Sequence, residues 1–285
     1  MKNGVDFPSG GGGLQVHRYT LRGDGSVNTW IIESAAAVVV IDLQRSLSAG
    51  REVAAQVAAL RKPLAAILIT HPHPDHFGGL ASFLAAFPGT PVFSSAATRE
   101  IMANDTNGFI AATKEILGAD APDVQPLPTV TFADGETLHF EEIELQVVEI
   151  GPGEAAAMSV FYAPAENALF AGDVVDNAMT PFLLEGQTAA WLRQIETLVT
   201  AYQARAPRVY PGHGAAGGME LFAETQALIT WFRHQIEETP PDRLTEEMDR
   251  LAGAYAARFP NHPPVAAIPE LIRLNLQAVA AEMNR

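Results

Sequence analysis

The sequence predicts an α/β protein in which two β-sheets face each other and helices cover their outer sides, an αββα sandwich. Three observations support this prediction. Apolar, β-branched runs of strand length alternate along the chain with longer segments of helical periodicity. The order strands, helix, strand, helices occurs in the first half and again in the second half. With 48% hydrophobic and 18% charged residues, the 285-residue chain can bury a substantial core.

The first half is expected to begin with a β-hairpin. Residues 15–21 and 27–33 form its two strands, and Gly23-Asp24-Gly25 supplies the turn. Either Ser46 or Ser48 can cap the helix that follows, because a serine hydroxyl accepts a hydrogen bond from an unpaired backbone N–H of the first turn. In chain order, the other elements of this half are a strand at 37–41, a helix to about residue 60, a strand at 65–70, a helix at 80–87, a strand at 91–94 and a helix at 96–103.

The second half repeats this order and ends in helices. No linker separates the halves, so residues 1–285 are predicted to form one domain, with a flexible, glycine-rich start at 1–13 and a helical C-terminal extension at 217–285. The predicted elements are strands at 130–132, 137–140, 142–150, 158–163, 168–171 and 208–210 and helices at 188–202, 219–238, 241–258 and 268–283.

The most informative stretch is the six-residue run His71-Pro72-His73-Pro74-Asp75-His76. It follows a short apolar strand, and open α/β sheets usually bind ligands at the carboxyl ends of their strands. The chain has 8 histidines, and three of them fall in this run. The two prolines fix φ and stiffen the loop, and imidazole and carboxylate are both ligands for zinc. We therefore predict a metal site in this loop.

This run, with Thr70 before it and Gly78-Gly79 after it, resembles the HxHxDH signature of the metallo-β-lactamase superfamily. The resemblance extends in order over residues 15–215 and implies the four-layer αββα fold of that family. It also implies two divalent metal ions. The ligands so implied are His71 and His73 for the first ion, Asp75, His76 and His213 for the second, and Asp173 as a bridge between both.

The sequence departs from the family pattern at one ligand. The first metal ion normally has a third histidine in a Gly-His-Thr context after a strand, whereas this chain reads Gly151-Pro152-Gly153-Glu154 there. Glu154 is the expected replacement, because carboxylate oxygen also ligates zinc; the alternative is a polar loop residue beside a weak first site. More carboxylate makes the site harder, so zinc is expected, with manganese or iron also accommodated.

The family resemblance implies a hydrolase. Two metal ions would generate a bridging hydroxide at neutral pH, and Asp75 would orient it and transfer a proton. The substrate class implied is a small ester, lactone, thioester, amide or sulfate ester. Asp42, at the end of a strand, is either an orienting partner of a ligand histidine or a plain turn residue. Residues 104–128, with a helix expected at 109–117, are either a lid beside the metal loop or a surface excursion.

Two other function classes stay open. One is a di-iron oxidoreductase on the same fold, although His73 is intact where the flavodiiron proteins carry Glu, and no second domain for a flavin is visible. The other is a binding protein that lost turnover through Glu154. The absence of cysteine excludes the β-lactamases that place a cysteine on the second metal ion. A thioesterase of the glyoxalase II type would be expected to keep the third histidine.

The formal net charge of −15 argues against a nucleic-acid partner and against an anionic membrane surface. No secretory signal or membrane span is apparent, so the cytoplasm is the expected location and a small molecule the expected partner. The sequence does not indicate an oligomeric state. The histidines outside the candidate site are expected to be structural or exposed; they are His17, His139, His234 and His262.

Overall fold

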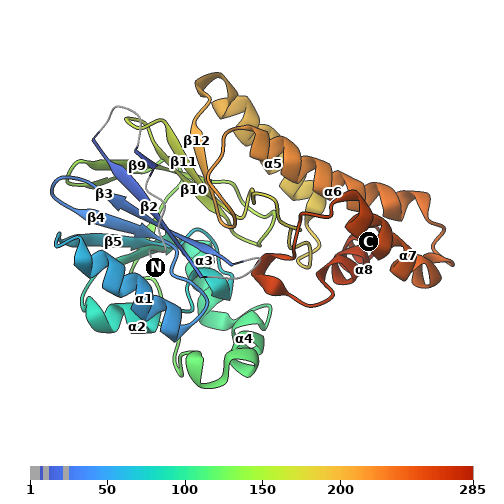
Figure 1. The fold of residues 1–285 in the computed structure, drawn as a ribbon, viewed down its shortest axis with the longest axis horizontal. Helices are drawn as coiled ribbons and strands as arrows, with labels where there is room; N and C mark the ends of the chain where they lie inside the picture. Colours follow the sequence, from blue (N-terminus) through green and yellow to red (C-terminus); the bar gives the residue numbers. More distant parts are fainter. Residues whose placement is uncertain (1–6, 9–12, 22–25, 285) are drawn as a thin grey trace.

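A computed structural model describes residues 7–8, 13–21 and 26–284 and confirms the αββα sandwich (Figure 1). Over these residues, the first sheet has seven strands whose order in space follows the sequence. They are β1 (Phe7–Pro8), β2 (Gln15–Thr20), β3 (Asn28–Glu33), β4 (Val38–Ile41), β5 (Leu64–Leu68), β6 (Val92–Ser95) and β7 (Val130–Phe132).

The second sheet contains five strands in the described part of the chain, in the order β12-β11-β10-β9-β8. Strands β4 to β7 run parallel to one another, and so do β11 and β12. The carboxyl ends of these strands therefore meet at one edge of the sandwich. The strands of this sheet are β8 (Thr137–Phe140), β9 (Ile143–Glu149), β10 (Ser159–Ala163), β11 (Ala168–Gly172) and β12 (Arg208–Pro211).

Helices cover both outer faces. Figure 1 shows α1 and α2 beneath the first sheet and α5 and α6 above the second, with α7 and α8 beside α6. Ser46, rather than Ser48, caps α1 by accepting a hydrogen bond from the Ala49 N–H. The helices are α1 (Leu47–Ala59), α2 (Leu80–Ala86), α3 (Ala96–Asn104), α4 (Phe109–Leu117), α5 (Thr188–Tyr202), α6 (Glu220–Glu238), α7 (Leu244–Arg258) and α8 (Leu271–Met283).

The alternation of strand residues creates the layers, because successive side chains point to opposite faces of a sheet. In β4, Val39 and Ile41 join the core between the sheets, whereas Val38 and Val40 pack toward α1 and α2. All four residues of this strand are therefore buried, which explains why it is apolar throughout. A third core joins the second sheet to α5–α8.

Two strands differ from the sequence-based expectations. Phe7–Pro8 pairs with β2, although this part of the chain was expected to be flexible. β7 belongs to the first sheet through its parallel pairing with β6, although it opens the second half of the sequence. The rest of the expected flexible start, residues 1–6 and 9–12, and the expected turn at 23–25 lie outside the described residues.

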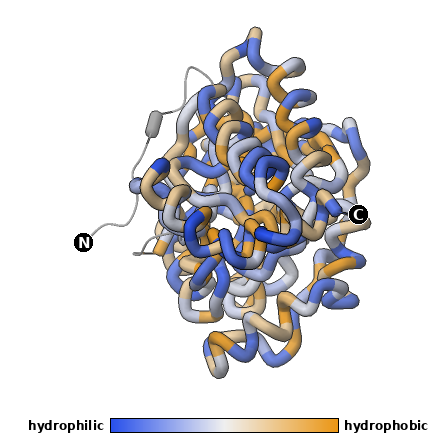
Figure 2. The backbone as a smooth tube through the Cα atoms, turned by 90° about the vertical axis from the view of Figure 1, so that its right-hand side faces the viewer, coloured by the Kyte–Doolittle hydropathy of each residue, from blue (hydrophilic) through white to orange (hydrophobic). Residues whose placement is uncertain are grey.

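Along the tube in Figure 2, hydrophobic and hydrophilic residues alternate over short distances. None of the helices described has the length and apolar character needed to cross a membrane.

Candidate metal centre

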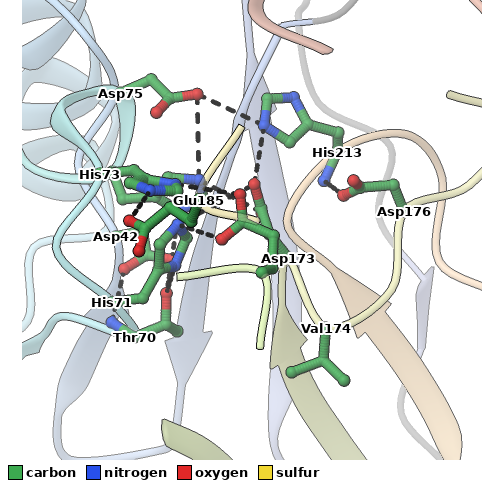
Figure 3. A network of polar contacts seen from close by, with 12 residues as sticks. Asp42, Thr70, His71, His73, Asp75, Asp173, Val174, Asp176, Glu185 and His213 are labelled. Atoms are coloured by element: carbon green, nitrogen blue, oxygen red, sulfur yellow. Dashed lines mark hydrogen bonds and ion pairs between the residues drawn. The ribbon is translucent and has the colours of Figure 1, made fainter. Parts of the chain in front are cut away.

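The candidate ligands come from segments that follow four different strands. The loop of His71–His76 follows β5, Glu154 follows β9, Asp173 follows β11 and His213 follows β12. The two sheets are joined at this edge, where the Ser159 N–H donates a hydrogen bond to the Thr70 carbonyl at 2.9 Å. Segments far apart in the sequence therefore converge on one place, as Figure 3 shows for the residues it labels.

Local structure fixes the histidine loop. Pro74 opens a single 3₁₀ turn, Pro74–His76, and the Gly78 N–H donates to the Pro74 carbonyl at 2.7 Å. Only glycine fits at position 78, since a Cβ there would lie 2.0 Å from the Arg45 carbonyl oxygen. The loop is thereby packed against the connection between β4 and α1.

The first group of candidate ligands consists of His71, His73 and Glu154. The Glu154 carboxylate lies 3.5 Å from His71 Nε2 and 3.0 Å from His73 Nδ1. One atom from each residue lies within 4.8 Å of the others, and all three residues are buried. This spacing is that of ligands around a common point rather than of a surface ion pair.

The second group consists of Asp75, His76 and His213. Asp75 Oδ2 lies 3.4 Å from His213 Nε2 and 3.9 Å from His76 Nε2. The two histidines are fully buried, whereas the Asp75 side chain is 16% exposed. Asp75 is thus the member of this group that faces the adjoining cavity.

Asp173 lies between the two groups. Its Oδ2 is 3.9 Å from His71 Nε2 and 3.4 Å from His213 Nε2, and its Oδ1 is 3.2 Å from His76 Nε2. Only glycine fits at position 212 beside this carboxylate, because a Cβ there would lie 1.6 Å from Asp173 Oδ1. Asp173 therefore touches members of both groups.

Buried polar atoms without hydrogen bonds test whether cations fit here. Within the two groups and Asp173, the following side-chain atoms are buried and have no hydrogen-bond partner among the described residues: His71 Nε2, His76 Nε2, both Glu154 oxygens and Asp173 Oδ1. Buried polar groups are normally satisfied, and these atoms converge on the two groups. Imidazole nitrogen and carboxylate oxygen suit zinc and the neighbouring divalent ions, so the residues present fit a two-ion centre.

Neighbouring carboxylates raise the pKa values of three histidines of the cluster, whereas burial lowers the pKa of His71 well below its usual range. Burial lowers the pKa of His76, but nearby carboxylates, Asp173 foremost, outweigh burial and raise the pKa well above its usual range. His213 behaves in the same way. Burial also lowers the pKa of His73, but Glu154 and then Glu185 raise it to about 10. Bound cations would supply the positive charge that protons otherwise provide.

Contacts behind the candidate ligands orient two of the imidazoles. Asp42 Oδ2 accepts a hydrogen bond from His76 Nδ1 at 2.8 Å and another from the Thr70 hydroxyl at 2.8 Å. Since the single hydroxyl proton of Thr70 is used there, Thr70 must accept from His71 Nδ1, 2.9 Å away. Both rings are thereby oriented with Nε2 toward the centre, where that nitrogen would bind an ion after losing any proton it carries. Of the two interpretations of Asp42, the orienting one matches these contacts.

Two acidic residues beside the centre were not predicted from the sequence. Glu185 Oε1 lies 2.9 Å from His73 Nε2 and accepts a hydrogen bond from Asn107 at 3.0 Å. Asp176 accepts a hydrogen bond from the His213 backbone N–H at 3.1 Å and is buried. The three-residue spacing of Asp173 and Asp176 could have drawn attention to the latter. No local pattern marks Glu185, which lies 112 residues from His73.

The other histidines lie in other surroundings. His17 lies 2.7 Å from Glu33 and His262 lies 2.8 Å from Glu224. His139 and His234 are exposed. Among these, none belongs to the groups of candidate ligands found in the described chain.

The segment between the halves contains the predicted helix, α4. The Phe109 ring is 5.4 Å from the His73 ring and 5.7 Å from the Phe182 ring, and His73 and Phe182 are 5.0 Å apart. The start of α4 is therefore packed against the histidine loop.

Known proteins resemble this chain in sequence. The sequence profile of the metallo-beta-lactamase superfamily matches residues 22–213. A hydroxyacylglutathione hydrolase from Alkalilimnicola ehrlichii is 30% identical over 241 residues, which cover 82% of this chain and 77% of that protein. A metallo-beta-lactamase type 2 from Bacteroides fragilis is 30% identical over 110 residues, and a hydroxyacylglutathione hydrolase from Shewanella sp. (strain ANA-3) is 27% identical over 207 residues. The chain spans only 44% and 65% of the length of these last two proteins.

Solved structures share the fold. The metallo-beta-lactamase from Pontibacter korlensis aligns with a TM-score of 0.63 at 22% identity and covers 80% of this chain and 99% of its own. One from Hirschia baltica aligns with a TM-score of 0.60 at 20% identity and covers 80% of this chain and 98% of its own. With a matching profile over most of its length and this fold, the chain belongs to the metallo-β-lactamase superfamily.

Proposed function

We propose that this protein is a metal-dependent hydrolase whose centre holds two divalent ions, most simply zinc. His71, His73 and Glu154 would hold the first ion and Asp75, His76 and His213 the second, with Asp173 shared between them. The single observation that carries this proposal is the convergence of these buried side chains, several of them without hydrogen bonds, on two adjacent points. Membership of the superfamily supports the same conclusion.

Glu154 is proposed as the third ligand of the first ion. Its side chain is buried, neither carboxylate oxygen has a hydrogen-bond partner among the described residues, and both point toward ligand histidines. An acidic side chain in this position would otherwise be costly, because an ionised carboxylate is strongly destabilised when it is buried without compensation. Burial accordingly raises the pKa of Glu154 to about 7, although His73 lowers it.

The chemistry proposed is hydrolysis of a small ester, lactone, thioester, amide or sulfate ester. Two bound ions would lower the pKa of water and polarise the bond to be cleaved. Asp75 faces the cavity. Burial raises its pKa, but His76 and then His213 outweigh burial and lower it, so the carboxylate is ionised at neutral pH. It can accept a proton from the attacking water and return it to the leaving group.

The names of curated relatives suggest two of the test substrates. Curated relatives are named hydroxyacylglutathione hydrolase and metallo-beta-lactamase, so a thioester and a β-lactam belong in the panel beside an aryl ester, a lactone and a sulfate ester. Elemental analysis of the purified protein should find close to two divalent ions per chain. At least one panel member should be hydrolysed, and the activity should disappear with a chelator and return with added zinc. A metal-loaded protein that hydrolyses none of them would refute the proposed function.

A further inference from the structure

A cavity of about 230 Å³ opens from the candidate metal centre. His73, Asp75, Glu154 and Asp173 line its inner end, so a molecule bound in it reaches both groups of candidate ligands. One water needs only about 10–15 Å³ of such space. The cavity can therefore hold a fragment of several carbon atoms next to the bond that is cleaved.

One wall of this cavity is a face of α4. Phe109, Ala112, Thr113 and Ile116 line it, and their spacing of three, four and seven residues places them on the same side of a helix. No residue of α4 is fully buried. The apolar face of this helix is therefore turned toward the cavity without being covered by the described protein core.

The opposite wall is also apolar. Phe182 and Leu184 contribute to it from the segment after β11, and Val265, Ala266 and Ile268 from the segment before α8. Figure 1 shows α4 standing away from the sandwich, below this C-terminal segment. Two separate parts of the chain thus supply hydrophobic side chains to a space beside the centre.

The charges of the lining disfavour an anionic group along these walls. Of the described residues that line the cavity away from its inner end, Arg45 is the one with a cationic side chain, and its Nη1 donates to the Ala266 carbonyl at 3.1 Å. Two bound ions would offset the charge of the three carboxylates at the inner end, and the other described residues of the walls are uncharged. A neutral, apolar group matches the walls better than a charged one.

Ile116 shows what an occupant would gain. Its side chain is 75% exposed, yet it lines the cavity. Contact with an apolar group would remove this surface from water, which is favourable in proportion to the area covered. Val124 is similarly exposed, at 80%, but does not line the cavity, so it provides a matched control.

We propose that the substrates carry a neutral apolar arm, such as a short acyl chain, which binds between α4 and the segment before α8. This inference rests on the proposed hydrolase function and specifies its substrate class. Hydroxyacylglutathione, whose peptide part is polar and negatively charged, matches these walls poorly. The arm would be recognised by burial, and the reacting bond by the metal centre.

Hydrolysis of 4-nitrophenyl acetate, butanoate and hexanoate by the metal-loaded protein tests the proposal. Each fully buried methylene is worth about fourfold in binding; because Ile116 leaves the cavity partly open, we expect kcat/KM to rise roughly 10- to 100-fold over the four added methylenes. Ile116→Ser should reduce this hexanoate preference by about tenfold, the equivalent of roughly two methylene contacts. Val124→Ser should keep the preference, and both variants should have wild-type thermal midpoints.

Two results would overturn the proposal. Equal hydrolysis of all three esters would refute the apolar arm and leave the hydrolase function standing. If no ester is hydrolysed, the substrate panel described above decides the hydrolase function, and binding of acetamide, butanamide and hexanamide, measured by ligand-observed NMR, decides the inference separately. Affinity that rises with chain length in the wild type and in Val124→Ser, but not in Ile116→Ser, supports the arm site. Affinity independent of chain length refutes it.

Discussion

Replacement of Glu154 by alanine should selectively weaken the first metal site. The substitution removes a buried carboxylate that lies 3.0 Å from His73 and 3.5 Å from His71. Loss of a contact behind a ligand typically lowers metal affinity about 10- to 100-fold, so loss of a ligand itself should lower it further, by roughly 100- to 1,000-fold. The second site keeps all its candidate ligands, including the shared Asp173.

The assay is competition for zinc between the metal-free protein and a chromogenic chelator. Wild type should show two tight sites, and Glu154→Ala should show one tight site and one weakened by two to three orders of magnitude. Glu154→His should restore two tight sites. Glu149→Ala is the control, because Glu149 lies at the end of β9 and outside the groups of candidate ligands. Two unchanged tight sites in Glu154→Ala would refute the assignment of Glu154 as a ligand.

Three further outcomes follow from the same geometry. Asp173→Ala should lower the affinity of both ions, measured by the same competition, because this carboxylate approaches both groups; loss confined to one ion would contradict a bridge. Glu185→Gln should weaken the first ion by about 10–100-fold, typical of a contact behind a ligand, since Glu185 lies 2.9 Å from His73; calorimetry that finds unchanged affinity would argue against an orienting role. Three histidines of the centre hold protons at pH 7 that compete with metal. The pKa of His73 is raised to about 10, and those of His76 and His213 are raised well above their usual range. Zinc binding should therefore release protons and tighten as pH rises from 6 to 8, which calorimetry in buffers of different ionisation enthalpy measures; binding without proton release would contradict these raised values.

Local patterns predicted most of the fold. Short apolar runs bounded by glycine, proline or aspartate marked the strands. Ser46 and Ser48 marked the start of α1 without deciding between them, and the structure shows that Ser46 is the cap. Pairing partners were harder to predict. β7 has only three residues, and nothing in them indicates whether they join the first or the second sheet. Phe7–Pro8 lies in a glycine-rich start whose composition gives no strand signal, yet its backbone pairs with β2.

The candidate site was predictable where its residues form a local pattern. The histidine loop is dense in ligands, and Asp42, Asp173 and His213 each follow an apolar strand, so an edge position could be inferred for each of them. Glu185 gave no such signal. Its contact with His73 depends on how the segment after β11 folds back over the histidine loop, which is a property of the tertiary structure.

The central claim is that two divalent ions share Asp173. Anomalous diffraction at the zinc edge from crystals of the zinc-loaded protein tests this claim most directly. Two anomalous peaks about 3.5–4 Å apart are expected. The Asp173 carboxylate should lie within about 2.0–2.2 Å of both peaks, and Glu154 at a similar distance from the peak nearer His71 and His73. A single peak, or two peaks away from Asp173, would contradict it.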